Sequence, residues 1–326
     1  METNEFPLVS IWCLVYNHEP YLRQCLDGFV MQNTNFKFEA IVHDDVSTDS
    51  SAAIIREYAE KYPDIIKPIF ETENQYSKRD GSLERIMHEA CKGKYIAICE
   101  GDDYWIDPLK LQKQVDYLLN HEDCGLVYTA YRQRNDLEKT TIDIITSSEI
   151  KHDVTFKWSL LEQKVMVGTC TAMVDSILLE QIRSFRDDFD GYMMGDTQIW
   201  FNAARMKNVG YIPEITAVYR KQPTGATSCF ETKSRIKFIQ NCQKAHLHLA
   251  YKYGAPIKTI ENIKEVFGYS LIQLYTNIAD YDSALKINAN NLKSSFIISL
   301  IIWVSKLLRL RKPLGMWRFY NLKKRL

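Results

Sequence analysis

Short apolar runs alternate with amphipathic segments over the first part of the chain. The apolar runs predict five strands, at residues 8–17, 38–45, 65–71, 95–99 and 125–129. The first run is almost continuously hydrophobic, which is typical of a strand that is buried on both faces of a sheet. Because the segments between the runs have helical periodicity, we expect right-handed crossovers and an α/β architecture with a mainly parallel sheet flanked by helices.

The pattern becomes less regular after residue 135. Residues 139–156 are polar and β-branched, and we interpret them as a loop or an edge hairpin. Two further strands are predicted at 168–174 and 209–220, whereas the periodicity from about residue 231 onward predicts helices alone. The expected organisation is an α/β domain, a C-terminal helical extension and a separate tail, at residues 1–225, 226–292 and 293–326.

Charge is distributed unevenly along the chain. The whole sequence has 41 basic and 41 acidic residues, but residues 293–326 contain nine Lys or Arg and no Asp or Glu. The preceding part therefore has 41 acids against 41 − 9 = 32 bases, a net charge of −9. An acidic body with a basic tail predicts two surfaces with different partners, and we expect no nucleic-acid partner.

The eight cysteines are scattered, and no two are closer than eight residues, so neither a C-x-x-C pair nor a zinc-type spacing is present. Several lie in apolar runs, where a reduced cysteine behaves as a small hydrophobic residue. The N-terminal residues have no secretory signal pattern. These features predict a reducing, cytoplasmic location.

Acidic residues follow two of the predicted strands. Asp44 and Asp45 end the second strand, and Glu100, Asp102 and Asp103 follow the fourth. Ligands of open parallel sheets bind beyond the carboxyl ends of the strands, so both clusters face one crevice if these strands are neighbours. Crowded carboxylates repel one another unless a divalent cation lies among them, and oxygen ligands suit Mg²⁺ or Mn²⁺, typically shared with a diphosphate. The alternative is that they are solvated loop residues or helix caps.

Other chemistries have little support in the sequence. There is no G-x-G-x-x-G after a strand, no G-x-x-x-x-G-K-[ST] loop, no H-E-x-x-H and no G-x-S-x-G elbow. The missing glycine fingerprint disfavours a nicotinamide-dependent oxidoreductase.

Taken in order, several segments of residues 7–225 resemble the family 2 glycosyltransferases of the GT-A fold. They include the first strand and its Tyr-Asn turn, the nucleotide-binding strand end, the D-x-D region, the segment of the catalytic base and the segment that closes the domain. The corresponding stretches are "PLVSIWCLVYNHEPYLRQCLDGFVMQ", "FEAIVHDDVSTDSS", "NQYSKRDGSLERIMHEACKGKYIAICEGDDYWIDPLKL", "GDTQIW" and "GYIPEITAVYR".

The resemblance implies transfer of a sugar, with inversion, from a nucleotide-diphosphate donor to an acceptor hydroxyl. It implies that Asp196 is the general base, with a helix N-cap as the alternative role. Tyr16 is expected to lie against the nucleobase, although a core aromatic is an equal alternative. Asp44 or Asp45 is expected to accept a hydrogen bond from the base.

The resemblance also implies that Arg79 reaches the nucleotide. Glu100 and Asp102 are expected at the nucleotide, and Asp102 and Asp103 at a Mn²⁺ or Mg²⁺ ion. Which carboxylate of this cluster binds the metal stays open, because Glu100 replaces the usual first Asp of D-x-D.

Two further positions depart from the family pattern. Val46 replaces the Gly of "DDGSTD", so we expect this position to avoid positive φ, which a β-branched residue disfavours. Lys221 and Gln222 stand where the family often has a His after "VYR", so another side chain is expected to meet the diphosphate.

The C-terminal tail combines an apolar run, residues 296–304, with the basic cluster. The run is too short to cross a bilayer, which needs about 20 residues. It predicts an amphipathic helix on an anionic membrane surface, suited to a lipid-linked acceptor. The alternative is a helix that docks on the domain with a solvated basic face.

The sequence therefore predicts a membrane-associated glycosyltransferase at the inner face of the cell membrane, which builds a polysaccharide or lipid-linked glycan. The competing hypothesis is a catalytically silent nucleotide-sugar-binding or scaffold protein at the membrane, which Glu100 and Val46 keep open.

Overall fold

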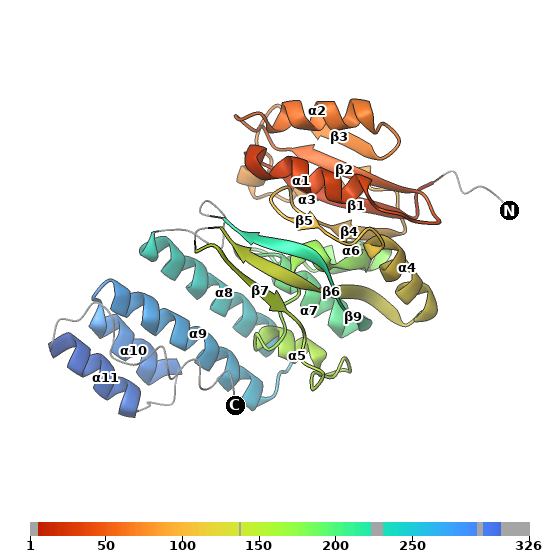
Figure 1. Cartoon of the computed structure of the whole chain (residues 1–326). Helices are drawn as coiled ribbons and strands as arrows, with labels where there is room; N and C mark the ends of the chain where they lie inside the picture. The colour runs from red at the N-terminus through yellow and green to blue at the C-terminus, as the bar shows by residue number, and fades with distance from the viewer. Residues whose placement is uncertain (1–5, 137, 223–230, 292–295, 308–326) are drawn as a thin grey trace. The chain divides into compact units, whose positions relative to one another are not determined.

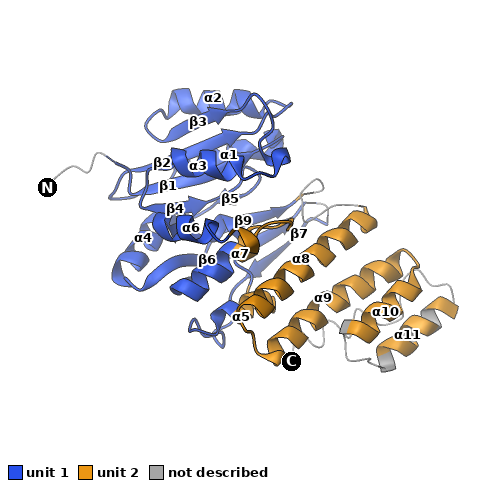
Figure 2. Cartoon of the chain, turned by 180° about the vertical axis from the view of Figure 1, so that it is seen from behind, with its two compact units in different colours: residues 1–157, 166–185, 199–221 blue, residues 158–165, 186–198, 222–326 orange. Residues whose placement is uncertain are grey.

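The computed structural model describes residues 6–136, 138–222, 231–291 and 296–307. The chain divides into two compact units, each of which is described by itself (Figure 2). The first unit contains residues 1–157, 166–185 and 199–221. The second contains residues 158–165, 186–198 and 222–326. The predicted boundaries at residues 225 and 292 lie outside the described residues.

The first unit is built around a nine-stranded sheet in the order β3-β2-β1-β4-β8-β6-β9-β5, with β7 paired to β6 (Figure 1). The strands are β1 (Val9–Val15), β2 (Phe38–Asp44), β3 (Ile66–Phe70), β4 (Tyr95–Ile98), β5 (Tyr104–Trp105), β6 (Cys124–Asn135), β7 (Thr140–Ile144), β8 (Met173–Asp175) and β9 (Asn208–Lys221). The strands β3, β2, β1 and β4 are mutually parallel, which confirms the parallel pairing expected of this part of the sheet, and β6 and β9 are parallel as well. The whole sheet is mixed, because β8 runs antiparallel between β4 and β6 and the edge strands β5 and β7 are also antiparallel.

Helices cover this sheet. They are α1 (Glu19–Val30), α2 (Ser51–Lys61), α3 (Ser82–Ala90), α4 (Lys110–Asn120), α5 (Phe156–Leu161), α6 (Ser176–Arg183) and α7 (Asp196–Met206), of which α5 continues into the second unit and α7 begins in it. Alternate side chains of β1, from Val9 to Val15, form one buried core with α1, α2 and α4. Trp12 points to the other face, where the guanidinium of Arg183 in α6 lies 4.7 Å from its ring centroid. The hydrophobic first strand is therefore covered on both sides, as its composition predicts.

Two of the predicted segments differ in detail. Residues 139–156 begin with β7, which forms the expected edge hairpin with β6. The strand predicted at 168–174 is reduced to β8, because its first half is the 3₁₀ turn η2 (Thr169–Thr171). Side chains satisfy the carbonyls of this turn: Trp105 Nε1 donates to Cys170 O at 2.8 Å. A strand partner is therefore not needed there.

The second unit is helical, and the described residues after 231 form helices as predicted. These are α8 (Thr232–Lys252), α9 (Ile257–Asn277), α10 (Tyr281–Asn291) and α11 (Phe296–Leu307). The segment 158–165 is bound to them, because the Glu162 carboxylate accepts hydrogen bonds from Thr259 Oγ1 at 2.7 Å and Asn262 Nδ2 at 2.8 Å.

The apolar run of the tail is helix α11, which has apolar side chains on both its buried and its exposed face. Ile298 and Ile302 are buried in a small core with Ile272 of α9 and residues of α10. Leu300, Trp303 and Leu307 are exposed. The docked-helix alternative thus describes one face of α11, while the other face leaves apolar side chains uncovered. Within the described ranges, no helix is both long and apolar enough to cross a membrane.

Candidate active site

The two acidic clusters lie at one edge of the sheet in the first unit. They lie at the ends of β2 and β4, which are separated in the sheet by β1, so the condition that these two strands are neighbours is not met. All three strands are parallel, so their carboxyl ends still share this edge. Asp45 N–H donates to Val15 O and Gly101 N–H to Leu14 O, both at 3.0 Å, so the end of β1 holds both clusters.

The loops after β1 and β2 are tied to each other. Asn17 N–H donates to Ser47 Oγ at 2.9 Å, and Asn17 Oδ1 accepts from the Thr48 N–H at 2.8 Å. In the same way, Glu19 Oε2 accepts from the Ser50 N–H at 2.9 Å. Each loop therefore satisfies backbone donors of the other next to the N-termini of α1 and α2, which fixes the edge between them.

Asp44 and Asp45 are both buried but differ in their bonds. The Asp45 carboxylate accepts from two consecutive amides, Gln75 N–H at 2.6 Å and Tyr76 N–H at 3.0 Å. Asp44 Oδ2 accepts from the Ser47 N–H at 3.3 Å, but the buried Asp44 Oδ1 has no hydrogen-bond partner among the described residues. A buried acceptor without a donor is costly, so Asp44 is suited to an N–H donor from a ligand.

Left-handed backbone recurs at this edge. Asn17, Val46 and Arg79 have φ angles of 55°, 64° and 53°. The expectation that Val46 avoids positive φ is wrong: Val46 adopts the conformation that the family's glycine would have. The hydrogen bonds of the linked loops around it override the local preference of a β-branched residue, at a cost of about 1–2 kcal/mol.

Tyr16 and Arg79 lie on the exposed side of the same edge. Half of the Tyr16 side chain is exposed, at 50%, so it is not a core aromatic. Arg79 is exposed and directly follows the 3₁₀ turn η1 (Tyr76–Lys78), whose first amide is bound to Asp45. Asp45 thus anchors the segment that presents Arg79.

The carboxylates after β4 differ in depth. Glu100 is exposed, Asp102 is partly buried, and Asp103 is buried, with 2% of its surface exposed. Asp103 Oδ1 accepts from the Arg220 N–H at 2.7 Å. Burial, and then the charge of Asp102, raise the pKa of Asp103 well above its usual range. Asp103 therefore attaches the acidic turn to β9, while Glu100 and Asp102 are less buried.

His18 is a site residue that the sequence analysis missed. Its buried Nδ1 atom has no hydrogen-bond partner among the described residues. Burial lowers its pKa, although the charges of Asp102 and Asp49 act in the opposite direction. A Cβ atom at Gly101 would lie 2.8 Å from His18 Nδ1, so glycine is needed for this close approach.

Arg220 was also missed as a site residue, although it lies in the quoted "VYR". It is buried, and one guanidinium nitrogen donates to Gln24 Oε1 at 2.8 Å. Its guanidinium carbon lies 4.7 Å from the ring centroid of Tyr21 and 4.9 Å from that of Tyr104. Two aromatic faces thus hold the cation in place.

Across the described ranges, no three or more His, Cys, Asp or Glu side chains are gathered as a set that could hold a metal ion by themselves. Mg²⁺ and Mn²⁺ sites on nucleotide substrates commonly use one or two carboxylates together with phosphate oxygens. Glu100 and Asp102, the two less buried carboxylates of this turn, fit that kind of site.

Asp196 belongs to the second unit, where it begins α7. Its Oδ1 atom accepts from the Thr197 N–H at 2.7 Å, and burial raises its pKa. Burial, and then the charge of Asp196, raise the pKa of the Cys242 thiol in α8 to about 12. Gln222, also in this unit, is buried, whereas Lys221 ends β9 in the first unit.

Comparison with known proteins identifies related sequences. The family described as "Glycosyl transferase family 2" matches residues 10–180, slightly more than half of the chain. The uncharacterised protein Rv1520 of Mycobacterium tuberculosis is 33% identical over 218 residues, which cover 67% of this chain and 60% of that protein. The putative teichuronic acid biosynthesis glycosyltransferase TuaG of Bacillus subtilis is 28% identical over 185 residues, 56% of this chain and 67% of TuaG. The matched region thus spans less than two thirds of the mycobacterial relative's length.

Two solved structures have the same fold. A mannosyltransferase of Pyrobaculum calidifontis, PcManGT, in complex with GDP-Man and Mn²⁺, has a TM-score of 0.58 at 18% identity and covers 99% of this chain and 85% of its own. S. aureus TarS 1–349 in complex with UDP-GlcNAc has a TM-score of 0.55 at 12% identity, covering 91% and 90%. The expected GT-A fold with a C-terminal helical region is confirmed.

Proposed function

The chain belongs to glycosyl transferase family 2, and we propose that it transfers a sugar from a nucleotide-diphosphate donor, expected to be UDP-linked, to an acceptor hydroxyl with inversion. The observation that carries this proposal is the unpaired, buried Asp44 Oδ1 at the same sheet edge as Glu100 and Asp102. A nucleobase N–H is a suitable donor for Asp44 Oδ1. Glu100 and Asp102 provide oxygen ligands for a divalent cation. The nucleotide-sugar complexes of TarS and PcManGT support the choice of donor class.

In this proposal the base of the donor lies against Tyr16 and donates to Asp44. Asp45 positions the turn that carries Arg79, because both of its oxygens are engaged by backbone amides of that turn. Arg79, being exposed, is free to turn its guanidinium toward the phosphates. Donor recognition thus combines one buried acceptor with two surface side chains.

We assign the metal contact to Asp102 together with Glu100. A bound Mn²⁺ or Mg²⁺ would neutralise the charge on the departing diphosphate. Asp103, predicted as a metal ligand, becomes a positioning residue, because its buried Oδ1 already accepts from the Arg220 N–H. The support for Mn²⁺ is the acidic pair itself and the Mn²⁺ in the PcManGT complex.

Asp196 is the proposed general base, which removes the proton of the acceptor hydroxyl as it attacks the donor sugar. Burial raises the pKa of Asp196, which makes its carboxylate a stronger base than an exposed one. A helix-cap contribution is compatible with this role, since its contact with the Thr197 N–H uses one carboxylate oxygen.

We further propose that the protein works at the inner, cytoplasmic face of the cell membrane on a polysaccharide or lipid-linked acceptor. The name of TuaG, the basic tail at 293–326 and the exposed Leu300, Trp303 and Leu307 of α11 support this. An outward apolar face next to basic residues is suited to an anionic membrane surface.

Donor hydrolysis tests the proposal and separates it from a silent nucleotide-sugar-binding protein. UDP-sugars and GDP-sugars are screened by thermal shift and then assayed for release of the diphosphate, with Mn²⁺ and with EDTA. We expect hydrolysis that vanishes in EDTA and returns with Mn²⁺. Donor binding without any turnover would support the silent alternative, and full activity in EDTA would remove the metal role.

A further inference from the structure

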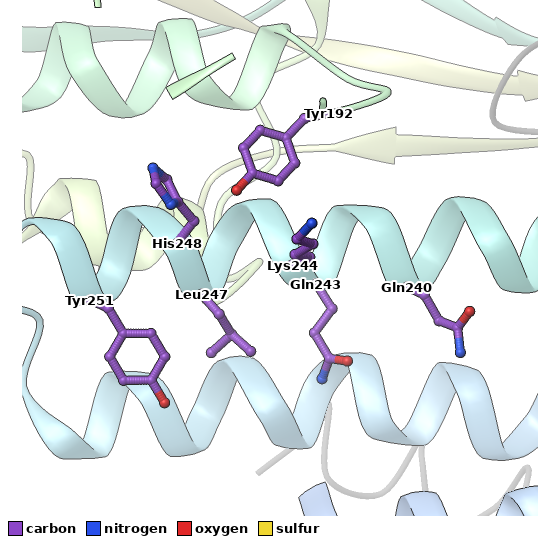
Figure 3. Close-up of a pocket in the computed structure, with 7 residues that line it drawn as sticks. All are labelled: Tyr192, Gln240, Gln243, Lys244, Leu247, His248 and Tyr251. Atoms are coloured by element: carbon purple, nitrogen blue, oxygen red, sulfur yellow. The ribbon is translucent and has the colours of Figure 1, made fainter. Parts of the chain in front are cut away.

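A shallow groove of about 390 Å³ runs along one face of α8, within the second unit (Figure 3). Its lining on α8 consists of residues spaced by three or four positions, which places them on one side of a helix. They are Gln240, Gln243, Lys244, Leu247, His248 and Tyr251. Lys244 and Tyr251 are well exposed, so these side chains are not needed to hold the core together.

The loop before α7 supplies the opposite wall. Tyr192 lies over α8 with its ring centroid 5.7 Å from that of His248 (Figure 3). Asn241 fixes this loop on both sides of Tyr192: its Oδ1 accepts from the Met193 N–H at 2.7 Å, and its Nδ2 donates to Gly191 O at 3.1 Å. The groove is therefore a built feature.

The base of the loop is anchored as well. Asp188 is fully buried and accepts from Lys252 Nζ at 2.7 Å and from the Tyr253 hydroxyl at 2.8 Å. His248 Nε2 is buried and lies 3.8 Å from Asp188 Oδ1, so this nitrogen belongs to the anchored base of the loop.

The lining is suited to a saccharide. Tyrosine rings offer apolar faces against which the C–H face of a pyranose packs, and glutamine amides both donate to and accept from hydroxyls. Gln240 is already oriented, because its Nε2 donates to the Tyr275 hydroxyl at 3.1 Å. The lining has one cation, Lys244, and no carboxylate, so its charge favours an anionic ligand.

The groove and Asp196 share one segment of chain. Tyr192 precedes Asp196 by four residues. The charge of Asp196 also raises the pKa of Cys242, which is next to Gln243 on α8. From Cys242 to Tyr251 the helix rises on the order of 13 Å, which gives an extended ligand several contacts along the axis. An oligosaccharide in the groove would thus extend along α8, the helix that carries Cys242, whose pKa is raised by the proposed base Asp196.

We propose that the α8 groove binds the acceptor, as an oligosaccharide chain that carries carboxylate or phosphate groups. That this ligand is the acceptor rests on the proposed glycosyl transfer, whereas binding of an anionic oligosaccharide in the groove does not. Lys244 binds the anionic group, Tyr192 and Tyr251 pack against sugar rings, and Gln243 binds hydroxyls.

Binding to the full chain is measured by titration calorimetry without donor, using two matched pairs of probes. Tetragalacturonic acid is compared with its methyl ester, and phosphorylated maltotetraose with maltotetraose. We expect the anionic member of at least one pair to bind roughly tenfold more tightly than its neutral partner, and the responsive pair identifies carboxylate or phosphate. Lys244→Gln and Tyr251→Ala should each weaken this binding several-fold, while Tyr251→Phe and the control Lys258→Gln, an exposed lysine of α9, should not.

Absence of binding by both anionic probes, or equal binding of charged and neutral members, overturns the proposal. Binding that is unchanged in both Lys244→Gln and Tyr251→Ala also overturns it. Hydrolysis of the donor is measured in parallel, and it should be unchanged in these variants. If the groove binds as expected but no nucleotide sugar is hydrolysed, the proposed transfer fails and the groove stands.

Discussion

The sheet edge of the first unit and the α8 groove of the second are built in opposite ways. At the sheet edge, buried carboxylates and backbone groups are held by bonds between loops distant in sequence, and strained residues such as Val46 are part of the structure. In the groove, exposed side chains of one helix form most of the surface. The first construction fixes a few polar atoms precisely enough for chemistry, whereas the second offers a surface for recognition. Substitutions should therefore change turnover and folding at the edge, and affinity at the groove.

The largest effects are expected for two carboxylates that the proposed function treats differently. Asp102→Asn should lower the rate of transfer roughly 10²–10⁴-fold, because a metal contact of several kcal/mol is lost. Asp196→Asn should lower it by about 10²–10⁴-fold, the usual contribution of a general base. Steady-state kinetics with donor titration separates them: Asp102→Asn should also weaken donor binding, and Asp196→Asn should not.

The pH dependence of transfer gives an independent check on Asp196. A general base acts in its deprotonated form, and burial raises its pKa. Activity should therefore be lost as pH falls through this raised pKa, at a higher pH than the ordinary Asp value of about 3.9. An acid limb that persists unchanged in a slow Asp196→Asn enzyme would assign the base to another residue.

The next largest effect uses two neighbours on α11 that face opposite ways. Ile302 is fully buried, so Ile302→Ala should lower the free energy of unfolding by about 2–5 kcal/mol. Trp303 is 54% exposed, so Trp303→Ser should leave the melting temperature nearly unchanged but weaken sedimentation with anionic liposomes. This pair tests whether the helical unit has both a docked and a membrane-facing side.

Salt and truncation serve as controls for that pair. Binding of the full chain to liposomes should weaken as salt rises, because each basic residue near the surface contributes about 1 kcal/mol that screening reduces. Deletion of 293–326 should abolish sedimentation and also lower stability, since it removes Ile298 and Ile302 from the core. A full-length protein that ignores anionic liposomes would refute the membrane role and leave α11 as a docked helix.

Asp44 and Asp45 provide a comparison within the sheet edge itself. Asp45→Ala leaves the Gln75 and Tyr76 amides without their acceptor, and it should destabilise the protein by about 1–3 kcal/mol in urea unfolding. Asp44→Ala removes one oxygen that has no partner and one that accepts a single 3.3 Å bond from the Ser47 N–H, so its cost to stability should be smaller and its effect on donor affinity larger. Equal stability losses with equal donor affinities would show that both are structural.

The sequence predicted those parts of the fold that depend on local pattern. The strands of β1 to β4, the acidic turns at their ends and the helices after residue 231 all follow from periodicity and from residue types at strand ends. The family resemblance supplied the fold and the candidate residues. The pairing of the strands was harder to predict from the sequence. The short antiparallel strand β8 follows a turn whose Cys170 carbonyl is bound by the distant Trp105 side chain.

The roles within the acidic turn were also beyond the sequence. Asp103 is bonded to Arg220, 117 residues away, and nothing local distinguishes it from Asp102. The unpaired Nδ1 of His18 depends on the close approach of Gly101. The prediction for Val46 was wrong because contacts between two loops outweigh a residue's own φ preference.

The smallest expected effect concerns Val46, and it tests whether the sheet edge, unlike the α8 groove, contains backbone strain that lowers stability. Val46→Gly should relieve about 1–2 kcal/mol of left-handed strain but add about 0.5–1 kcal/mol of backbone entropy to the unfolded state. The free energy of unfolding should therefore rise by about 0–1.5 kcal/mol. Val154→Gly is the matched control, because Val154 is 73% exposed and is not among the residues with positive φ, so it should lose stability without compensation.

Donor affinity should be unchanged in Val46→Gly, since glycine adopts the same φ of 64° and the linked loops keep their hydrogen bonds. If Val46→Gly is less stable than Val154→Gly relative to the parent, the conformation of Val46 is not strained, and the rigidity of the sheet edge must come from its hydrogen bonds alone.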